Sequence, residues 1–100
     1  MANEGHYKAF QRIKKLYDEA RTPSMNKMEI HPGTEVFIHR RAMTEAMDDF
    51  NDTHNWKQLA TNVFVEIYGD TLRLMSVKGT KGKIKMHTKI YKAVKEFVYA

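Results

Sequence analysis

The chain of 100 residues contains no cysteine. Disulfide bonds, thiolate metal sites and a cysteine nucleophile are therefore excluded. The absence of cysteine also fits a reducing compartment, so we expect a cytoplasmic protein. Long apolar runs are missing as well. The first residues, MANEGHYKAF, lack the apolar centre of a signal peptide, and no later stretch approaches the length of a membrane span. We therefore expect no membrane partner.

Recognisable catalytic and nucleotide-binding motifs are also missing. The segment Gly79-Thr80-Lys81-Gly82 has the glycine spacing of the KH loop that clamps a nucleic-acid backbone, but a predicted strand precedes it here instead of a helix. The same segment has two residues between its glycines, whereas a Walker A loop has four. None of the five histidines has a partner at the spacing of a helical metal site. We therefore expect a non-enzymatic protein without a metal or cofactor.

The most informative feature of the sequence is its charge asymmetry. Residues 1–70 carry nine lysines and arginines against eleven acidic residues, whereas residues 71–100 carry eight against one. The stretch VKGTKGKIKMHTKIYKAVK, residues 77–95, holds seven lysines and no acid. Such an asymmetry favours a polyanionic partner or an acidic protein surface.

The apolar spacing predicts a single α+β domain over residues 1–100. Phe10, Ile13, Leu16 and Tyr17 lie on one face of an N-terminal helix, and Ala42, Met43, Ala46 and Met47 on one face of a central helix. A short hairpin is predicted around Pro32-Gly33, although residues 34–41 also fit the start of a helix. In chain order the expected elements are a helix over 3–21, the hairpin over 27–39, the central helix over 42–50, a three-stranded antiparallel meander over about 62–87, and a C-terminal helix that follows it.

The meander is predicted from the segment NVFVEIYGDTLRLMSV, in which Gly69-Asp70 has the composition of a two-residue hairpin turn. Pairing around this turn places Glu66 opposite Arg73 on one face and apolar residues on the other. Before the meander, Asn55 followed by Gln58 is typical of a helix N-cap and predicts a short helical turn that ends near Ala60.

The lysines of the C-terminal segment are predicted to face solvent. Strand alternation and helical periodicity both direct them outward, so they form a cationic patch that contacts phosphates or simply protects a sheet edge. A lysine offers a point charge without the bidentate fork of arginine, so we expect backbone contacts with weak sequence preference, to either DNA or RNA. The predicted nucleic-acid-binding residues are Lys78, Lys81, Lys83, Lys85, Lys89 and Lys92.

Two alternatives remain open at this stage. The first is a protein–protein interaction module, such as a small viral or mobile-element regulator or inhibitor of a host complex, with a candidate interface at Asp48, Asp49, Asp52 and Trp56. The second is a small ribonuclease-type toxin with Lys83, Lys85, His87 and Tyr91 on a basic sheet. Tyr91, Tyr99 and His87 are also able to stack on bases, but they are first interpreted as packing residues.

Overall fold

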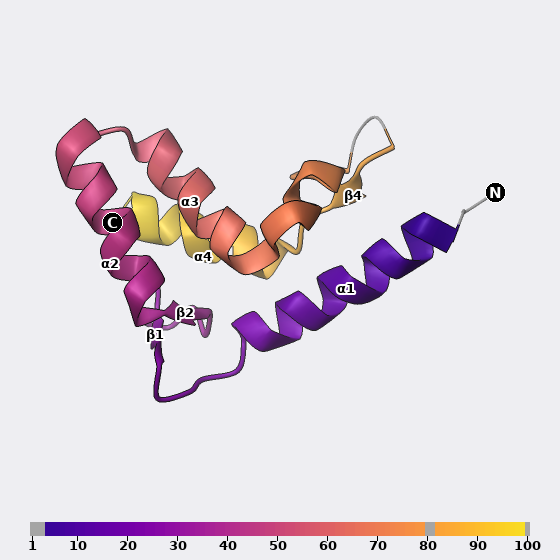
Figure 1. Cartoon of the computed structure of the whole chain (residues 1–100), viewed down its shortest axis with the longest axis horizontal. Coiled ribbons are helices and arrows are strands. Elements are labelled where there is room, and N and C mark those ends of the chain that lie inside the picture. Colours follow the sequence, from indigo (N-terminus) through magenta and orange to yellow (C-terminus); the bar gives the residue numbers. More distant parts are fainter. Residues whose placement is uncertain (1–3, 80–81, 100) are drawn as a thin grey trace.

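Four α-helices, a 3₁₀ helix and two very small sheets make up the part of the chain that the computed structural model describes, residues 4–79 and 82–99 (Figure 1). The predicted α+β class is confirmed. In chain order the elements are α1 (Glu4–Ala20), β1 (Lys27–Glu29), β2 (Phe37–His39), α2 (Arg40–Thr53), α3 (Trp56–Tyr68), the 3₁₀ helix η1 (Gly69–Leu74), β3 (Met75–Ser76), β4 (Ile84–Lys85) and α4 (Thr88–Val98).

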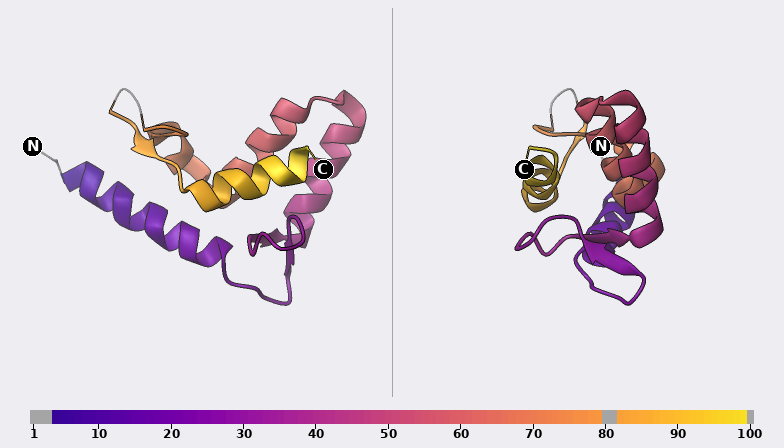
Figure 2. Two further views of the ribbon diagram at one scale, coloured as in Figure 1. Left: turned by 180° about the vertical axis from the view of Figure 1, so that it is seen from behind. Right: turned by 90° about the vertical axis from the view of Figure 1, so that its left-hand side faces the viewer.

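Helix α1 packs mainly its C-terminal half against the rest of the molecule, although Ala9 also contacts the core. Ile13 and Ala20 are buried and Leu16 is half-buried, as the apolar spacing predicts, whereas Tyr7 is largely exposed. Figures 1 and 2 show the N-terminal half of α1 extending away from the other helices. The predicted N-terminal helix is therefore confirmed, but part of its apolar stripe lies beyond the core.

The predicted hairpin is present as the antiparallel pair β1–β2. Met28 lies opposite Ile38, and Ile30 and Val36 are buried beyond the strand ends. Gly33 has a φ of 88°, which the third position of a type II turn requires. The ambiguity over residues 34–41 is also resolved, because β2 ends at His39 and α2 begins at Arg40.

The predicted three-stranded meander over 62–87 is wrong. Residues 56–68 form α3, and residues 69–74 continue as η1, so the Glu66–Arg73 cross-strand pair does not exist. Among the described residues of this region only β3 and β4 are strands, and they pair in parallel, with Met75 opposite Ile84. The turn expected at Gly69-Asp70 is instead the transition from α3 to η1, where Gly69 has a φ of 56°.

The sequence of this region carries two periodicities, and the helical one prevails. Alternation of Val63, Val65 and Ile67 resembles a strand, but Leu59, Val63 and Ile67 also lie four residues apart, and all three are buried in the helix. The predicted N-cap is confirmed, since Asn55 Oδ1 accepts a hydrogen bond from the Gln58 N–H at 3.2 Å. The helix it starts continues past Ala60 to Tyr68.

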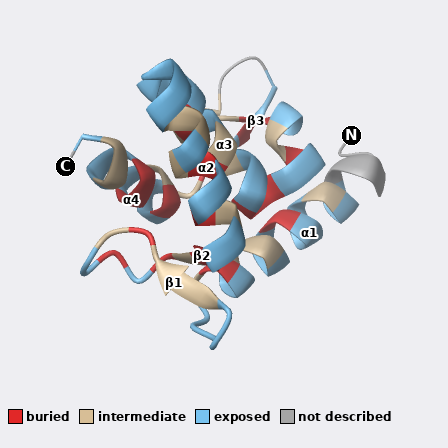
Figure 3. Cartoon of the chain, turned by 60° about the vertical axis from the view of Figure 1, so that its left-hand side comes forward, coloured by how far each residue is buried: buried red, intermediate tan, exposed pale blue. Residues whose placement is uncertain are grey.

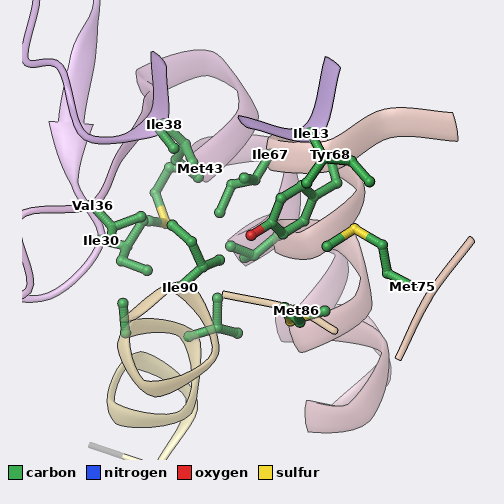
Figure 4. Close-up of a cluster of buried hydrophobic side chains, with 14 of the residues drawn as sticks. Ile13, Ile30, Val36, Ile38, Met43, Ile67, Tyr68, Met75, Met86 and Ile90 are labelled. Carbon is green, nitrogen blue, oxygen red and sulfur yellow. The ribbon is translucent and has the colours of Figure 1, made fainter. Parts of the chain in front are cut away.

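Helix α3 is central to the fold. It contacts α1, α2, α4 and η1, and its buried face meets the other elements in one hydrophobic core. Figure 4 shows Ile13 of α1, Met43 of α2, Tyr68 of α3 and Ile90 of α4 gathered there, and the core also includes the hairpin residues Ile30, Val36 and Ile38. Helices α2 and α4 both pack against α3, each through its own contacts. Figure 2 shows the three helices from two further directions.

Candidate functional site

The predicted lysines lie on one continuous segment that runs from β3 through β4 into α4 (Figure 1). Lys78, Lys83 and Lys85 belong to the β3–β4 region, and Lys89 and Lys92 to α4. All five are exposed, and together they are called the lysine face below. The sixth predicted residue, Lys81, lies outside the described residues.

Helix α4 presents its lysines to solvent because its apolar residues face the core. Ile90, Ala93 and Val94 are buried, and Lys89 and Lys92 lie on the opposite side. Figure 3 shows the same division, with the buried surface of α4 towards the rest of the molecule and its exposed surface outward. The final helix and the outward placement of its lysines are therefore as the periodicity predicts.

Little of the charge of the lysine face is neutralised. The Nζ of Lys89 lies 3.8 Å from Oε2 of Glu35, and the Nζ of Lys83 donates a hydrogen bond to the carbonyl of Arg73 at 3.0 Å. Within the described part of the chain, no carboxylate lies in ion-pair distance of Lys78, Lys85 or Lys92. The lysine face is thus a surface of accumulated positive charge.

The carboxylate that does reach this face comes from the hairpin. Glu35 has a φ of 57°, and its N–H donates to Oε2 of Glu29 at 2.8 Å, which fixes the backbone beside the turn. Oε2 of Glu35 accepts a hydrogen bond from Arg21 Nη2 at 3.0 Å as well as facing Lys89. Because Glu35 is shared between two cations, it neutralises the lysine face only in part.

His87 anchors the junction of β4 and α4 beneath the lysine face. Its ring stacks on Tyr17 with centroids 4.0 Å apart, and its Nδ1 shares a hydrogen bond with the Tyr68 hydroxyl at 3.0 Å. Burial lowers the pKa of His87, which the negative charge of Asp18 partly opposes, and burial raises the pKa of Tyr68. The neutral His87 thereby ties α4 to α1 and α3 and sets the position of Lys85 and Lys89 on either side of it.

The residues of the predicted protein interface have separate surroundings. Asp48 and Asp52 are exposed on α2, and Asp49 Oδ2 accepts a hydrogen bond from Asn62 of α3 at 3.3 Å. Trp56, in contrast, faces the end of α4, where its ring centroid lies 5.2 Å from that of Tyr99. Trp56 is therefore more closely associated with α4 than with the acidic residues of α2.

A small apolar pocket between α3 and the end of α4 is absent from the sequence prediction. Trp56 and Tyr99 stand at its rim with Lys95, and Phe64, Val94 and Val98 line it. We call this the aromatic pocket. The aromatic pocket does not follow from the strand prediction for residues 62–68, because that prediction places Trp56 and Phe64 on different elements. The capping signal at Asn55 and the four-residue spacing of Leu59 and Val63 favour the helix that forms one wall of the pocket, but no local pattern shows that this helix meets the end of α4.

The residues proposed for ribonuclease chemistry do not share a sheet. Strand β4 comprises only Ile84 and Lys85, the imidazole of His87 is held by Tyr17 and Tyr68, and Tyr91 lines the aromatic pocket. Across the described residues, no three histidine or acidic side chains are grouped as a metal site would require. No helix in that part of the chain has the length and apolar character needed to cross a membrane.

Comparisons with protein-family models, curated proteins and solved structures find no match to this chain. The functional argument therefore depends on the lysine face and the aromatic pocket themselves.

Proposed function

We propose that the protein is a non-enzymatic binding protein that contacts the phosphates of nucleic acid through the lysine face. The observation that carries this proposal is the exposure of Lys78, Lys83, Lys85, Lys89 and Lys92 on one chain segment, where the ion pair among the described residues is that of Lys89 with Glu35. Lys81 is proposed to contact phosphates as well, on the basis of the sequence alone. Lysines that replace condensed counterions on phosphates give salt-dependent binding, with dissociation constants of about 10⁻⁴ to 10⁻⁶ M for non-specific sites.

The lysine composition also favours a particular kind of binding. An ammonium group recognises a phosphate as a point charge and lacks the planar donor pair that distinguishes guanine from other bases. The proposed interaction is therefore with the backbone and has weak sequence preference. It requires no cofactor, because the positive charge is supplied by the side chains.

Charge reversal on the lysine face tests the proposal. The variant Lys85→Glu, Lys89→Glu, Lys92→Glu is expected to weaken binding to labelled oligonucleotides by about 100-fold or more, measured by fluorescence anisotropy at low salt. All three side chains are exposed, so the fold is expected to persist, which circular dichroism checks. Unchanged affinity in the folded variant would contradict the proposal.

A control is available at the start of α2, away from the lysine face. Arg40 and Arg41 are exposed at the start of α2, so Arg40→Glu, Arg41→Glu also reverses neighbouring positive charges. Its affinity for the oligonucleotides is expected to fall only slightly, through the lower net charge. An equal loss in both variants would mean that total charge, and not the lysine face, governs binding.

The second candidate function is docking on a protein with an acidic surface, as a small regulator or inhibitor. The exposed aromatic rings beside the lysines favour this candidate. The centres of protein interfaces are rich in tryptophan and tyrosine and contain few acidic residues. Absence of oligonucleotide binding at the lowest salt, together with capture of an acidic protein that the charge-reversed variant fails to capture, would favour this candidate instead.

A further inference from the structure

The two aromatic rings at the rim of the aromatic pocket are unusually open for so small a domain. Trp56 is 43% exposed and Tyr99 is 61% exposed, although apolar side chains of Phe64, Val94 and Val98 lie directly beside them. The two rings lie with their centroids 5.2 Å apart and are tilted by 54° to each other, so they are not stacked face to face. The pocket, of about 140 Å³, is therefore an apolar site whose aromatic walls are accessible from solvent.

The charged groups around the pocket are mainly cationic. Lys95 lines it, and the Nζ of Lys57 lies 5.7 Å from the centre of the Trp56 ring. Along α4 the exposed lysines at positions 89, 92 and 95 follow one another at intervals of three residues, over about 9 Å of helix axis. The row thus leads from the lysine face to the pocket. Glu96 is the single acid on this helix.

We propose that the aromatic pocket receives an unstacked base of single-stranded nucleic acid, while Lys89, Lys92 and Lys95 contact the phosphates of the same strand. This inference rests on the proposed function and specifies its ligand. An apolar site next to a row of lysines fits a ligand that joins a flat, uncharged ring to anionic groups, which describes a nucleotide within a strand. A purely apolar peptide would leave the lysine charges without partners.

The preference for a single strand follows from the geometry of stacking. Aromatic side chains stack on bases whose faces are free, and such bases occur in single strands, whereas the bases of a duplex already stack on their neighbours. A duplex still offers phosphates to the lysine face. Duplex and single strand are therefore expected to share the electrostatic contacts and to differ at the aromatic pocket.

The protein contains one tryptophan, so the fluorescence of Trp56 reports directly on the pocket. An unlabelled oligothymidylate, its duplex with oligoadenylate, and heparin are titrated into the full chain at low salt. The single strand is expected to quench Trp56 and to bind more tightly than the duplex. The duplex and heparin, which lack free bases, are expected to bind with little quenching. Equal quenching and equal affinity for single strand and duplex would overturn the inference.

Substitution of Tyr99 separates stacking from charge. Tyr99→Ala is expected to weaken single-strand binding by about 5- to 150-fold, the range measured for loss of one stacked base, and to leave duplex binding unchanged. Tyr99→Phe retains the ring and serves as the matched control. Because Tyr99 is exposed at the end of α4, both variants are expected to fold. An equal effect of Tyr99→Ala on both nucleic acids, or none on either, would contradict the inference.

The experiment also distinguishes failure of this inference from failure of the proposed function. If neither the single strand nor the duplex binds at low salt, both proposals are wrong. The single strand and the duplex could both bind, lose affinity in the Lys85→Glu, Lys89→Glu, Lys92→Glu variant, and bind the Tyr99→Ala variant with unchanged affinity. In that case the lysine face binds phosphates and the aromatic pocket does not take a base. Binding of an acidic protein that quenches Trp56, without any oligonucleotide binding, would assign both sites to a protein partner.

Discussion

Helix α3 has a different surface on each side. Towards α2 it borders an acidic groove to which α2 contributes Glu45 and Asp49, and α3 contributes Glu66. Towards α4 it borders the aromatic pocket, with Lys95 at the rim and the lysine face beyond it. The first side offers carboxylates and few large apolar groups, whereas the second combines cations with two exposed aromatic rings.

This difference shows how a small domain keeps its charges from neutralising one another. The acidic helix α2 and the basic helix α4 each pack against α3, and the acidic groove and the aromatic pocket are lined by different residues of α3. Glu35, which comes from the hairpin, is the described carboxylate that reaches the lysine face. A polyanion that approaches the molecule is therefore attracted to the α4 side and repelled from the α2 side, which orients it before contact.

The largest expected effect comes from breaking the attachment of α4 to α3. Ile90 is fully buried, so Ile90→Ala is expected to lower the free energy of unfolding by about 2–5 kcal/mol through lost apolar contacts and a residual cavity. Urea denaturation measures the change. Lys92→Ala on the exposed side of the same helix is expected to alter stability by less than about 0.5 kcal/mol. Similar losses in the two variants would contradict the placement of α4.

A smaller loss of stability is expected where the backbone at Gly79 approaches Lys85 of β4. Gly79 has a φ of 70°, and a Cβ at this position would lie 3.1 Å from the Cβ of Lys85. Gly79→Ala is expected to destabilise the fold by more than the ~1–2 kcal/mol of a left-handed alanine, because it also displaces β4.

Gly82 provides the matched control for that substitution. Its φ of 74° is nearly the same, but a Cβ there would have no neighbour within 4 Å. Gly82→Ala therefore isolates the backbone contribution, and the excess cost in Gly79→Ala, measured by urea denaturation, reports the close approach to Lys85. Equal costs would mean that Gly79 does not approach Lys85 as described.

The pH dependence of stability tests the anchor beneath the lysine face. Burial lowers the pKa of His87 below its ordinary value of 6.5, so below pH 6.5 the unfolded chain takes up a proton before the folded one does. The contribution of neutral His87 to the free energy of unfolding is therefore complete above pH 6.5 and decreases as the pH falls below it. His87→Gln is expected to lower stability at neutral pH but to reduce its dependence on pH between about 7.5 and 5.5. Urea midpoints at both pH values provide the measurement, and an unchanged pH dependence would contradict the lowered pKa of the half-buried His87.

The smallest effect is expected from the single acid of α4. Glu96→Gln removes a negative charge from the α4 side, and single-strand affinity is expected to rise by about two- to fivefold, as is typical of an exposed charge pair. Glu66→Gln removes a charge from the α2 side and is expected to leave affinity nearly unchanged. Anisotropy titrations at one low salt concentration compare the two. Equal gains would show that the two sides of α3 are not electrostatically distinct.

Much of the fold could be predicted from the sequence, because most elements carry one dominant periodicity. The spacing of Phe10, Ile13 and Tyr17 fits one face of a helix and not of a strand, and the paired alternation around Pro32-Gly33 fits a hairpin. The outward placement of Lys85, Lys89 and Lys92 was also predictable. Lys85 alternates with buried residues along the chain, and Lys89 and Lys92 lie away from the buried face of their helix. These local patterns agree with the tertiary structure.

The segment from Trp56 to Leu74 could not be predicted in the same way. Its β-branched and aromatic residues satisfy strand alternation and helical spacing together, and tertiary packing selects the helix, because a helix can contact α1, α2 and α4 at once. The aromatic pocket depends on that choice, since it joins the first turn of α3 to the end of α4. A site made by two elements distant in sequence leaves no local pattern by which it could be found.

The central claim is that the lysine face binds phosphates, and the salt dependence of binding tests it most directly. Anisotropy of a labelled single strand is measured with the native protein from about 50 to 200 mM salt. With about five phosphates contacted, the logarithm of the binding constant is expected to fall against the logarithm of salt concentration with a slope of about −3 to −4. Absence of binding at the lowest salt, or binding with a slope near zero, would contradict the claim.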